Sequence, residues 1–249
     1  MTPDPTTSRA FYQAIFGWQF DGTDTDSIAL VNDRPVCGVW SDDAELGQGL
    51  SYWHVYLEVS DLHSTLARAR QPDGTVLWGP TDYRGVAAIA TLRDPAGATF
   101  SVWQSATPGE FLTDVAGASS WTELVTEDPV AIVDFYRQTL ELEPASAHLG
   151  DRSYRLFIGD DRPIAGVVQS ATAAHWRTYF LVTDLAATLD TATAAGGTVA
   201  SSPCETLIGT TAFIRDPHGA LLGLREQRKT SGKSRAPDDN AGFPITLDL

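Results

Sequence analysis

One histidine and two carboxylates are the residues of this chain best suited to acid–base chemistry. His54 lies in the alternating segment 53–60, and Glu58 follows on the same face of the strand. The two are roughly 13 Å apart along an extended strand, so Asp248 near the C-terminus is the better partner if the last segment lies beside His54. Histidine titrates near neutrality and a carboxylate fixes its tautomer, so we predict an acid or base at His54 supported by Asp248 or Glu58. A hydrogen-bonded polar residue of a cavity wall is the alternative interpretation.

Strand alternation predicts which side chains share a cavity with His54. In segment 53–60 the apolar alternate positions are expected to pack on helices, which turns His54, Tyr56 and Glu58 inward. The same rule turns inward one set of side chains from 99–104 and one from 245–249, and Trp40 is a further aromatic candidate for stacking on a flat ligand. The predicted ligand contacts of this first cup are Tyr56, Ser101, Trp103, Thr246 and Trp40.

A second set of inward-facing residues predicts a second cup. Its polar and aromatic members are Trp121, Glu123, Arg177 and Tyr179. Arg and Glu suit an anionic or hydroxylated ligand, or they pair with each other.

The elements that position these side chains come from an internal duplication. Phe11-Tyr12 recurs as Phe135-Tyr136, and Arg93-Asp94-Pro95 recurs as Arg215-Asp216-Pro217. Each half contains twice the order strand, helix, three strands. We therefore predict a first domain at 1–105, a linker at 106–119, a second domain at 120–228 and a flexible polar linker at 229–242.

The first half starts directly with a helical pattern, whereas its copy starts with the strand 121–125. The C-terminal segment 243–249 resembles this missing strand, with Asp248 at the place of Glu123. We therefore predict a circular permutation in which the C-terminal strand completes the N-terminal domain. A swapped arrangement, in which this strand completes another chain's sheet, is the alternative.

The chain resembles the vicinal-oxygen-chelate superfamily of glyoxalases, bleomycin-resistance proteins and extradiol dioxygenases. The resemblance is carried by Phe11-Tyr12 with Phe16-Gly17-Trp18, by the strand ends at Asp61 and Asp184, and by the Asp-Pro-x-Gly turns at Asp94 and Asp216. It implies an α+β fold of two glyoxalase-like domains, in which paired βαβββ modules form cupped sheets with the helices outside. Members of this family bind small molecules in the cup, often with a divalent metal at its floor.

The resemblance also implies where metal ligands would lie, namely on the first, fifth and eighth strands of a domain. His54 matches the fifth-strand position, but Thr246 and Ser101 match the other two. In the second half the matching residues are Trp121, Arg177 and Gly223. A divalent ion needs three or more converging ligands, so we predict no metal and no cofactor. Asp248 or Glu58 is the one route to a non-standard site.

Composition limits the partners. Against 17 Lys and Arg stand 32 Asp and Glu, a net charge of −15, which argues against binding nucleic acid or an anionic membrane. The two cysteines form neither a disulfide framework nor a metal motif, and the chain shows no membrane-length apolar run. We expect a cytoplasmic protein that is a monomer or a homodimer.

Two functions fit these features. The first is a metal-independent enzyme that acts on an aromatic or polycyclic secondary metabolite, as an isomerase, cyclase, lyase or accessory oxidation component. The second is a protein that sequesters an antibiotic without catalysis. The combination of His, Tyr, Glu and Asp in one cup slightly favours the enzyme.

Overall fold

The computed structural model describes residues 1–41, 50–83, 85–107, 111–149, 152–227 and 246–248. The fold is α+β, as the sequence predicts, and most of its elements are strands. Among the described residues no helix is both long and apolar enough to cross a membrane.

The elements of the first half follow one another with a helix at the start of each module. They are α1 (Pro5–Phe16), β1 (Gln19–Gly22), β2 (Asp26–Val31), β3 (Arg34–Trp40), β4 (Tyr56–Glu58), α2 (Leu62–Ala69), β5 (Thr75–Tyr83), β6 (Ala87–Arg93) and β7 (Thr99–Ser105).

The second half repeats this order and adds a leading strand and a short C-terminal strand. Its elements are β8 (Ser119–Thr126), α3 (Val133–Leu140), β9 (Glu143–Leu149), β10 (Arg152–Gly159), β11 (Arg162–Gln169), β12 (His175–Val182), α4 (Leu185–Ala194), β13 (Thr198–Val199), β14 (Cys204–Thr206), β15 (Gly209–Arg215), β16 (Leu221–Glu226) and β17 (Thr246–Asp248).

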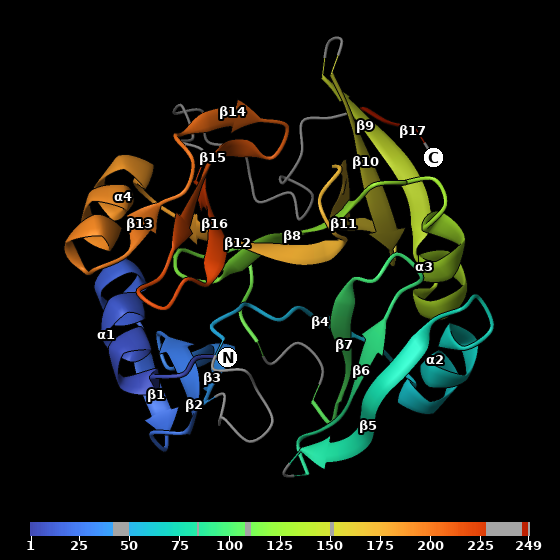
Figure 1. The fold of residues 1–249 in the computed structure, drawn as a ribbon, viewed down its shortest axis with the longest axis horizontal. Coiled ribbons are helices and arrows are strands. Elements are labelled where there is room, and N and C mark those ends of the chain that lie inside the picture. The colour runs from blue at the N-terminus through green and yellow to red at the C-terminus, as the bar shows by residue number, and fades with distance from the viewer. Residues whose placement is uncertain (42–49, 84, 108–110, 150–151, 228–245, 249) are drawn as a thin grey trace, which may run out of the picture.

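The two halves form their sheets differently. In the second half one continuous sheet has the order β13-β15-β16-β12-β8-β11-β10-β9-β17, and β14 joins it at β15. Here β8 lies parallel to β11 and antiparallel to β12, and so joins the two modules. In the first half β1-β2-β3 and β4-β7-β6-β5 are separate sheets (Figure 1).

The predicted place of the C-terminal strand is wrong. Instead of completing the first half, β17 pairs antiparallel with β9 of the second half, with Thr246 opposite His148 and Asp248 opposite Ser146. An edge strand such as β9 presents unpaired backbone groups, and an extended segment gains hydrogen bonds by adding to it. The predicted linker 229–242 lies outside the described residues.

Within the described residues no strand lies between β3 and β4, the position that β8 occupies in the second half. The parallel bridge between Thr2 and Ser41 corresponds to the pair Thr126–Gln169 at the end of β8. Among the described residues β4 pairs with β7 alone, and it has three residues where the sequence pattern indicates an alternating strand over 53–60.

The hydrophobic cores join the halves rather than separate them. α2 packs against α3 and α1 against α4, and Figure 1 shows these two pairs at opposite sides of the molecule. One core cluster combines Leu62 and Phe100 of the first half with Phe135 and Phe157 of the second. The other combines Phe11 and Trp18 with residues of α4, β15 and β16. Neither half buries its helices without the other.

Two buried tyrosines, one per half, lock the halves together in a pseudo-symmetric way. The Tyr136 hydroxyl donates to Asp94 Oδ2 (2.8 Å) and accepts from Trp176 Nε1 (3.0 Å). The equivalent Tyr12 hydroxyl donates to Asp216 Oδ2 (3.0 Å) and accepts from Trp53 Nε1 (3.0 Å). Burial, and then the adjacent carboxylate, raise the pKa of each tyrosine well above its usual value, so both remain donors.

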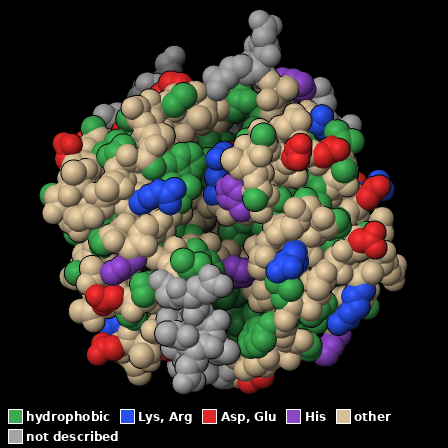
Figure 2. Space-filling model, in the orientation of Figure 1, with side chains coloured by type: hydrophobic (Ala, Val, Ile, Leu, Met, Phe, Trp, Pro, Cys, Tyr) green, Lys and Arg blue, Asp and Glu red, His purple; other side chains and the backbone are tan. Residues whose placement is uncertain are grey.

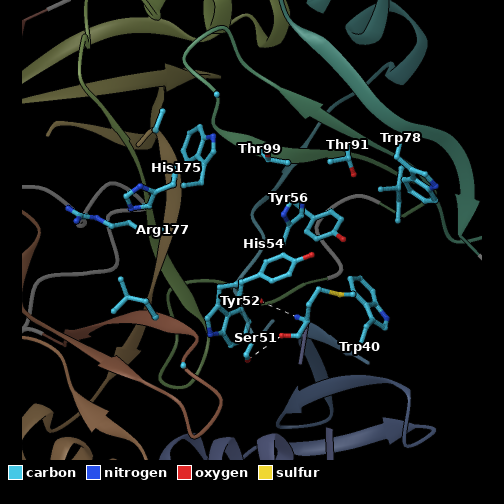
Figure 3. A pocket seen from close by; sticks show the side chains of 18 of the residues that line it. Trp40, Ser51, Tyr52, His54, Tyr56, Trp78, Thr91, Thr99, His175 and Arg177 are labelled. Carbon is cyan, nitrogen blue, oxygen red and sulfur yellow. Dashed lines mark hydrogen bonds between the residues drawn. The ribbon is translucent and has the colours of Figure 1, made fainter. Parts of the chain in front are cut away.

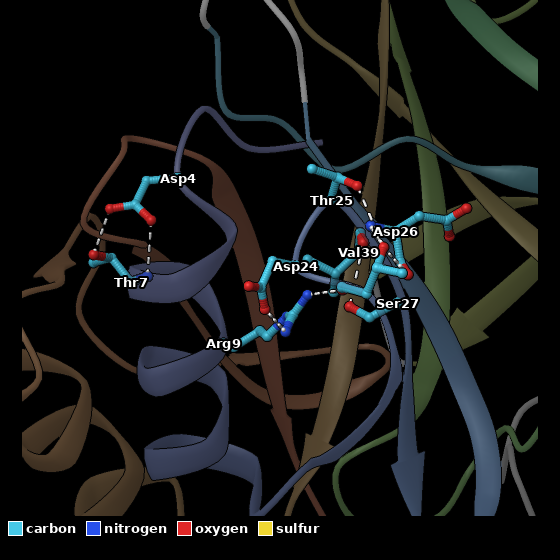
Figure 4. A network of polar contacts seen from close by, with 9 residues as sticks. Asp4, Thr7, Arg9, Asp24, Thr25, Asp26, Ser27 and Val39 are labelled. Atoms are coloured by element: carbon cyan, nitrogen blue, oxygen red, sulfur yellow. Dashed lines mark hydrogen bonds and ion pairs between the residues drawn. The ribbon is translucent and has the colours of Figure 1, made fainter.

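Local sequence determines where the helices begin. Asp4, Asp61 and Asp184 cap α1, α2 and α4, each accepting a backbone N–H three residues later. On α1 the Asp4 carboxylate also accepts from the Thr7 hydroxyl (2.7 Å), and Arg9 pairs with Asp24 (3.2 Å) to fasten the helix to the β1–β2 turn (Figure 4).

The tyrosine lock predicts the effect of removing one hydroxyl. Tyr136→Phe should lower the free energy of unfolding by about 1–3 kcal/mol, because Asp94 is buried and loses its side-chain donor. Urea denaturation measures this change. The control is Tyr52→Phe, the same chemical change at a side chain that is 42% exposed. Equal stabilities of the two variants would contradict the prediction.

Candidate active site

A cavity of about 900 Å³ opens between the first cup and the middle of the molecule. One wall is aromatic, with Trp40, Tyr52, Tyr56 and Trp78 among its residues, and His54 lies between them (Figure 3). The far wall comes from β12 and from the β15–β16 turn of the second half. The volume is near the upper end of the range for pockets that bury drug-sized ligands.

His54 is held by a chain of hydroxyl groups. Its Nε2 lies 2.9 Å from Ser101 Oγ, and Ser101 Oγ lies 2.9 Å from Thr91 Oγ1. Ser101 occupies Nε2, so Nδ1 is the nitrogen able to exchange a proton with a ligand. Burial lowers the pKa of His54 to about 4, which makes the imidazole neutral at physiological pH.

Tyr56, the first residue of β4, lies two positions after this histidine and carries a hydroxyl group. The ring centroids of His54 and Tyr56 are 5.3 Å apart in an edge-to-face arrangement. Burial raises the pKa of Tyr56 to about 12, so its hydroxyl remains protonated. The pair therefore combines a neutral acceptor with a neutral donor.

Asp26 orients the outer aromatic wall. Its Oδ1 accepts from Trp40 Nε1 (2.8 Å) and from the Tyr83 hydroxyl (3.1 Å). The rings of Trp40 and Tyr83 are 5.9 Å apart, and the ring of Tyr56 is 5.9 Å from that of Trp40. One carboxylate at the start of β2 thus determines how two side chains from β3 and β5 face the cavity.

The structure brings together only part of the predicted first site. His54, Tyr56 and Trp40 line the large cavity, and the same three residues line an adjacent cavity of about 360 Å³ together with Glu58 and Trp103. The sequence predicts that Ser101 contacts a ligand. In the structure Ser101 is buried and hydrogen-bonds to His54 instead.

The predicted carboxylate support for His54 is wrong. The strand that carries Thr246 and Asp248 lies on β9. Among the described residues, the side chain that hydrogen-bonds to His54 is that of Ser101.

The second cup is filled by its own side chains. Glu123 is 4% exposed, and its Oε2 accepts from Arg177 Nε (2.7 Å) and from the Tyr179 hydroxyl (2.6 Å). Its Oε1 accepts from the Tyr154 hydroxyl, which in turn accepts from Trp121 Nε1 (2.8 Å). Four predicted contacts of a second ligand therefore form one internal network.

Glycines make this network possible. A Cβ at Gly166 would lie 1.8 Å from the Tyr154 hydroxyl oxygen, and one at Gly223 would lie 2.2 Å from the Tyr179 ring. The absence of a side chain at both positions admits the two tyrosines. Apolar residues, including Leu156 and Ile208, fill the rest of this cup.

The described residues do not fit the metal site that the fold family implies. Such a site needs several His or carboxylate ligands that converge. At the matching positions the first cup offers His54 and Ser101, and the second offers Arg177, a cation already bound to Glu123. Among the described residues no group of three or more His, Cys, Asp or Glu converges.

Comparisons with known proteins agree with this architecture. Residues 1–103 match the model of the glyoxalase-like domain, and residues 119–224 match that of the glyoxalase/bleomycin resistance protein/dioxygenase superfamily. The anthracycline biosynthesis protein DnrV of Streptomyces peucetius is 32% identical over 92% of this chain and 91% of its own. The chain belongs to the glyoxalase/bleomycin resistance protein/dioxygenase superfamily.

Other members of the superfamily show how broadly the fold is used. The putative glyoxylase CFP32 of Mycobacterium tuberculosis is 27% identical over 90% of both chains. The Mn(II)-bound glyoxalase of Novosphingobium aromaticivorans superimposes with a TM-score of 0.64 at 15% identity, covering 98% of this chain and 88% of that one. The 2,3-dioxygenase LapB of Pseudomonas sp. KL28 superimposes with a TM-score of 0.63 at 14% identity, covering 89% of this chain and 88% of that one. At these identities the two structures establish the fold alone.

Some cavity residues escape the sequence reasoning. Asp26, Tyr83, Trp78 and Thr91 come from β2, β5 and β6, whose faces are not assigned from the sequence pattern alone. Alternation in Ala87–Arg93 does carry a signal, since Ala87, Ile89 and Thr91 all lie on one face and two of them line the cavity. Nothing in the sequence signals the role of Asp26.

The pKa of His54 predicts a pH-dependent stability. The pKa of about 4 in the folded protein is below the usual histidine value of 6.5, so the unfolded chain binds a proton first as the pH falls. Stability due to the neutral imidazole is complete above pH 6.5 and is lost as the pH falls toward 4. In His54→Gln the melting temperature should fall less than in the wild type between pH 6.5 and 4. His63→Gln, at an exposed position, should behave like the wild type; if His54→Gln does so too, the burial effect is absent.

The filled second cup predicts a stability role for Glu123. Glu123→Gln leaves the Arg177 guanidinium without its counter-charge and should destabilise the fold by about 3 kcal/mol. Urea denaturation measures the loss, and Glu127→Gln, an exposed residue in the turn after β8, is the control. If Glu123→Gln lowers the free energy of unfolding no more than Glu127→Gln does, the Glu123 network contributes little to stability.

Proposed function

We propose that the protein is a metal-independent enzyme of secondary metabolism that binds a flat, polycyclic aromatic compound in the first cup and moves a proton on it. The observation that carries this proposal is His54, a neutral and fixed imidazole in the cavity between aromatic walls. The first cup, not the second, is the active one in this proposal.

The aromatic wall supports the choice of ligand. Trp40 contacts both Tyr56 and Tyr83 edge to face, and Asp26 holds Trp40 and Tyr83 through hydrogen bonds. Aromatic side chains pack against ligand rings through stacked and edge-to-face contacts. A preoriented wall of this kind binds a planar molecule at a low entropic cost.

The chemistry follows from the protonation states. For Nδ1 of His54 to accept a proton, Nε2 must carry its hydrogen and donate it to Ser101, which then donates to Thr91. With a pKa of about 4, the imidazole is a weak base suited to an acidic C–H next to an aromatic ketone. Tyr56 supplies a hydrogen bond to the oxygen that gains negative charge, so an isomerisation or tautomerisation is the simplest reaction this site supports.

The relatives support the metabolic setting. DnrV of Streptomyces peucetius and DauV of Streptomyces sp. strain C5 are both anthracycline biosynthesis proteins, and each aligns with 92% of this chain. Anthracyclines contain fused aromatic and quinone rings, the shape that the cavity favours.

Sequestration without catalysis is the second candidate, because the same aromatic walls bind a flat antibiotic whether or not His54 reacts. The two candidates differ in whether bound ligand is chemically changed.

Anthrone distinguishes them. It is a flat tricyclic ketone whose methylene protons exchange when a base removes them. Incubated with the protein in heavy water under argon, anthrone should take up deuterium at least tenfold faster than in buffer, as followed by mass spectrometry. His54→Ala should remove the acceleration but still quench tryptophan fluorescence on binding, and His63→Ala should keep both activities.

The pH profile adds a second criterion. The accelerated exchange should be constant above about pH 5 and fall as the pH drops through 4, since the neutral imidazole is the active form. Binding of anthrone without accelerated exchange would favour sequestration. Failure to bind anthrone at all would overturn the assignment of the cup.

A further inference from the structure

The large cavity has two chemically different ends, and only one is used by the proposed reaction. The aromatic end belongs to the first half. The other end is lined by His175 and Arg177 of β12 (Figure 3). Arg215, beside the β15–β16 turn, also lines it. Figure 2 shows Arg and His side chains at the edge of the hollow in the middle of this face.

This end of the cavity is basic, whereas the whole chain is acidic. Acidic residues outnumber Lys and Arg by 32 to 17. The described cavity lining nevertheless contains two arginines, two histidines and one carboxylate, Asp26, which lies at the aromatic end and is engaged by Trp40 and Tyr83. Glu123 neutralises Arg177, so Arg215 supplies the net positive charge of the polar end.

The geometry of Arg215 suits an anion at the cavity mouth. Its Nη1 donates to the Gly219 carbonyl oxygen (2.9 Å), which fixes the guanidinium at the rim, and its side chain is exposed. His175 lies nearby, with its Nδ1 2.8 Å from the Ala173 carbonyl oxygen. A guanidinium held in this way binds a carboxylate through paired hydrogen bonds.

We propose that the substrate class is a polycyclic aromatic compound that carries a carboxylate, with its rings against Trp40 and Tyr56 and its acid group at Arg215 and His175. This inference rests on the proposed function, since it names the ligand of the same cup. It explains why the cavity continues beyond the aromatic walls into the second half.

A pair of matched probes tests the inference. Anthraquinone-2-carboxylic acid and anthraquinone-2-carboxamide have the same rings and differ in the charge of one substituent. Titration by tryptophan fluorescence should give a Kd about tenfold lower for the acid at low salt, and the preference should shrink as sodium chloride screens the interaction.

Two variants locate the effect. Arg215→Gln should abolish the preference and leave the affinity for the amide unchanged. Arg93→Gln is the matched control, because Arg93 holds the equivalent turn position in the first half, is exposed, and is outside the described lining of the cavity. Thermal melting of both variants confirms that each is folded.

The outcomes separate this inference from the proposed function. Equal Kd values for the acid and the amide would overturn the carboxylate site and leave the aromatic site intact, whereas no binding of either probe would overturn both. Tighter binding of doxorubicin, whose amino sugar is cationic, than of the acid would show that the overall negative charge governs selection, and would also overturn the carboxylate site.

Discussion

The structure depends on a reciprocal exchange between the halves. Each half contributes one buried tyrosine from its first helix and one buried aspartate from its last turn, and each tyrosine donates to the aspartate of the other half. Each aspartate accepts backbone N–H groups of its own turn through Oδ1, whereas the hydroxyl donor to its buried Oδ2 comes from the other half, so this hydrogen bond forms only when the halves meet. The helix pairs and the mixed hydrophobic cores follow from this exchange. The cavity lies where the two halves meet, so its shape is a property of the whole chain.

The duplication produces two cups that differ in how far their own side chains fill them. In the second cup, glycines at 166 and 223 admit two tyrosines, which close around Glu123 and leave a polar core. Among the described residues of the first cup, the aromatic side chains stand around the opening, where Trp40 contacts Tyr56 and Tyr83 edge to face. Side-chain volume at a few positions, on the same backbone plan, therefore decides which half keeps room for a ligand.

The sequence predicts the fold better than the site. Repeated motifs and strand alternation correctly indicate the α+β modules and the inward faces of His54, Tyr56, Glu123 and Arg177. They fail for the C-terminal strand, because the alternation in Thr246–Asp248 suits any sheet edge and β9 offers one. They also miss Asp26, since its role depends on indole and phenol groups brought close by β3 and β5. Strand alternation predicts which face of a sheet a residue occupies. Its hydrogen-bond partners depend on distances that only the folded chain defines.

One strand position accounts for the chemical difference between the cups. His54, just before β4, and Arg177, on β12, both face inward from the segment that leads into the second helix of their half. Although burial works against its charge, Glu123 raises the pKa of Arg177, and a guanidinium so held takes no part in proton transfer. His54 has the Ser101 hydroxyl as its partner, and burial, with a smaller effect of the N-terminal ammonium, lowers its pKa so that the imidazole stays neutral. A carboxylate beside His54 would raise its pKa toward neutrality and favour the imidazolium, which cannot accept a proton. The hydroxyl chain of Ser101 and Thr91 thus makes the first cup suited to removing a proton, and the Glu123 network makes the second suited to holding the fold together.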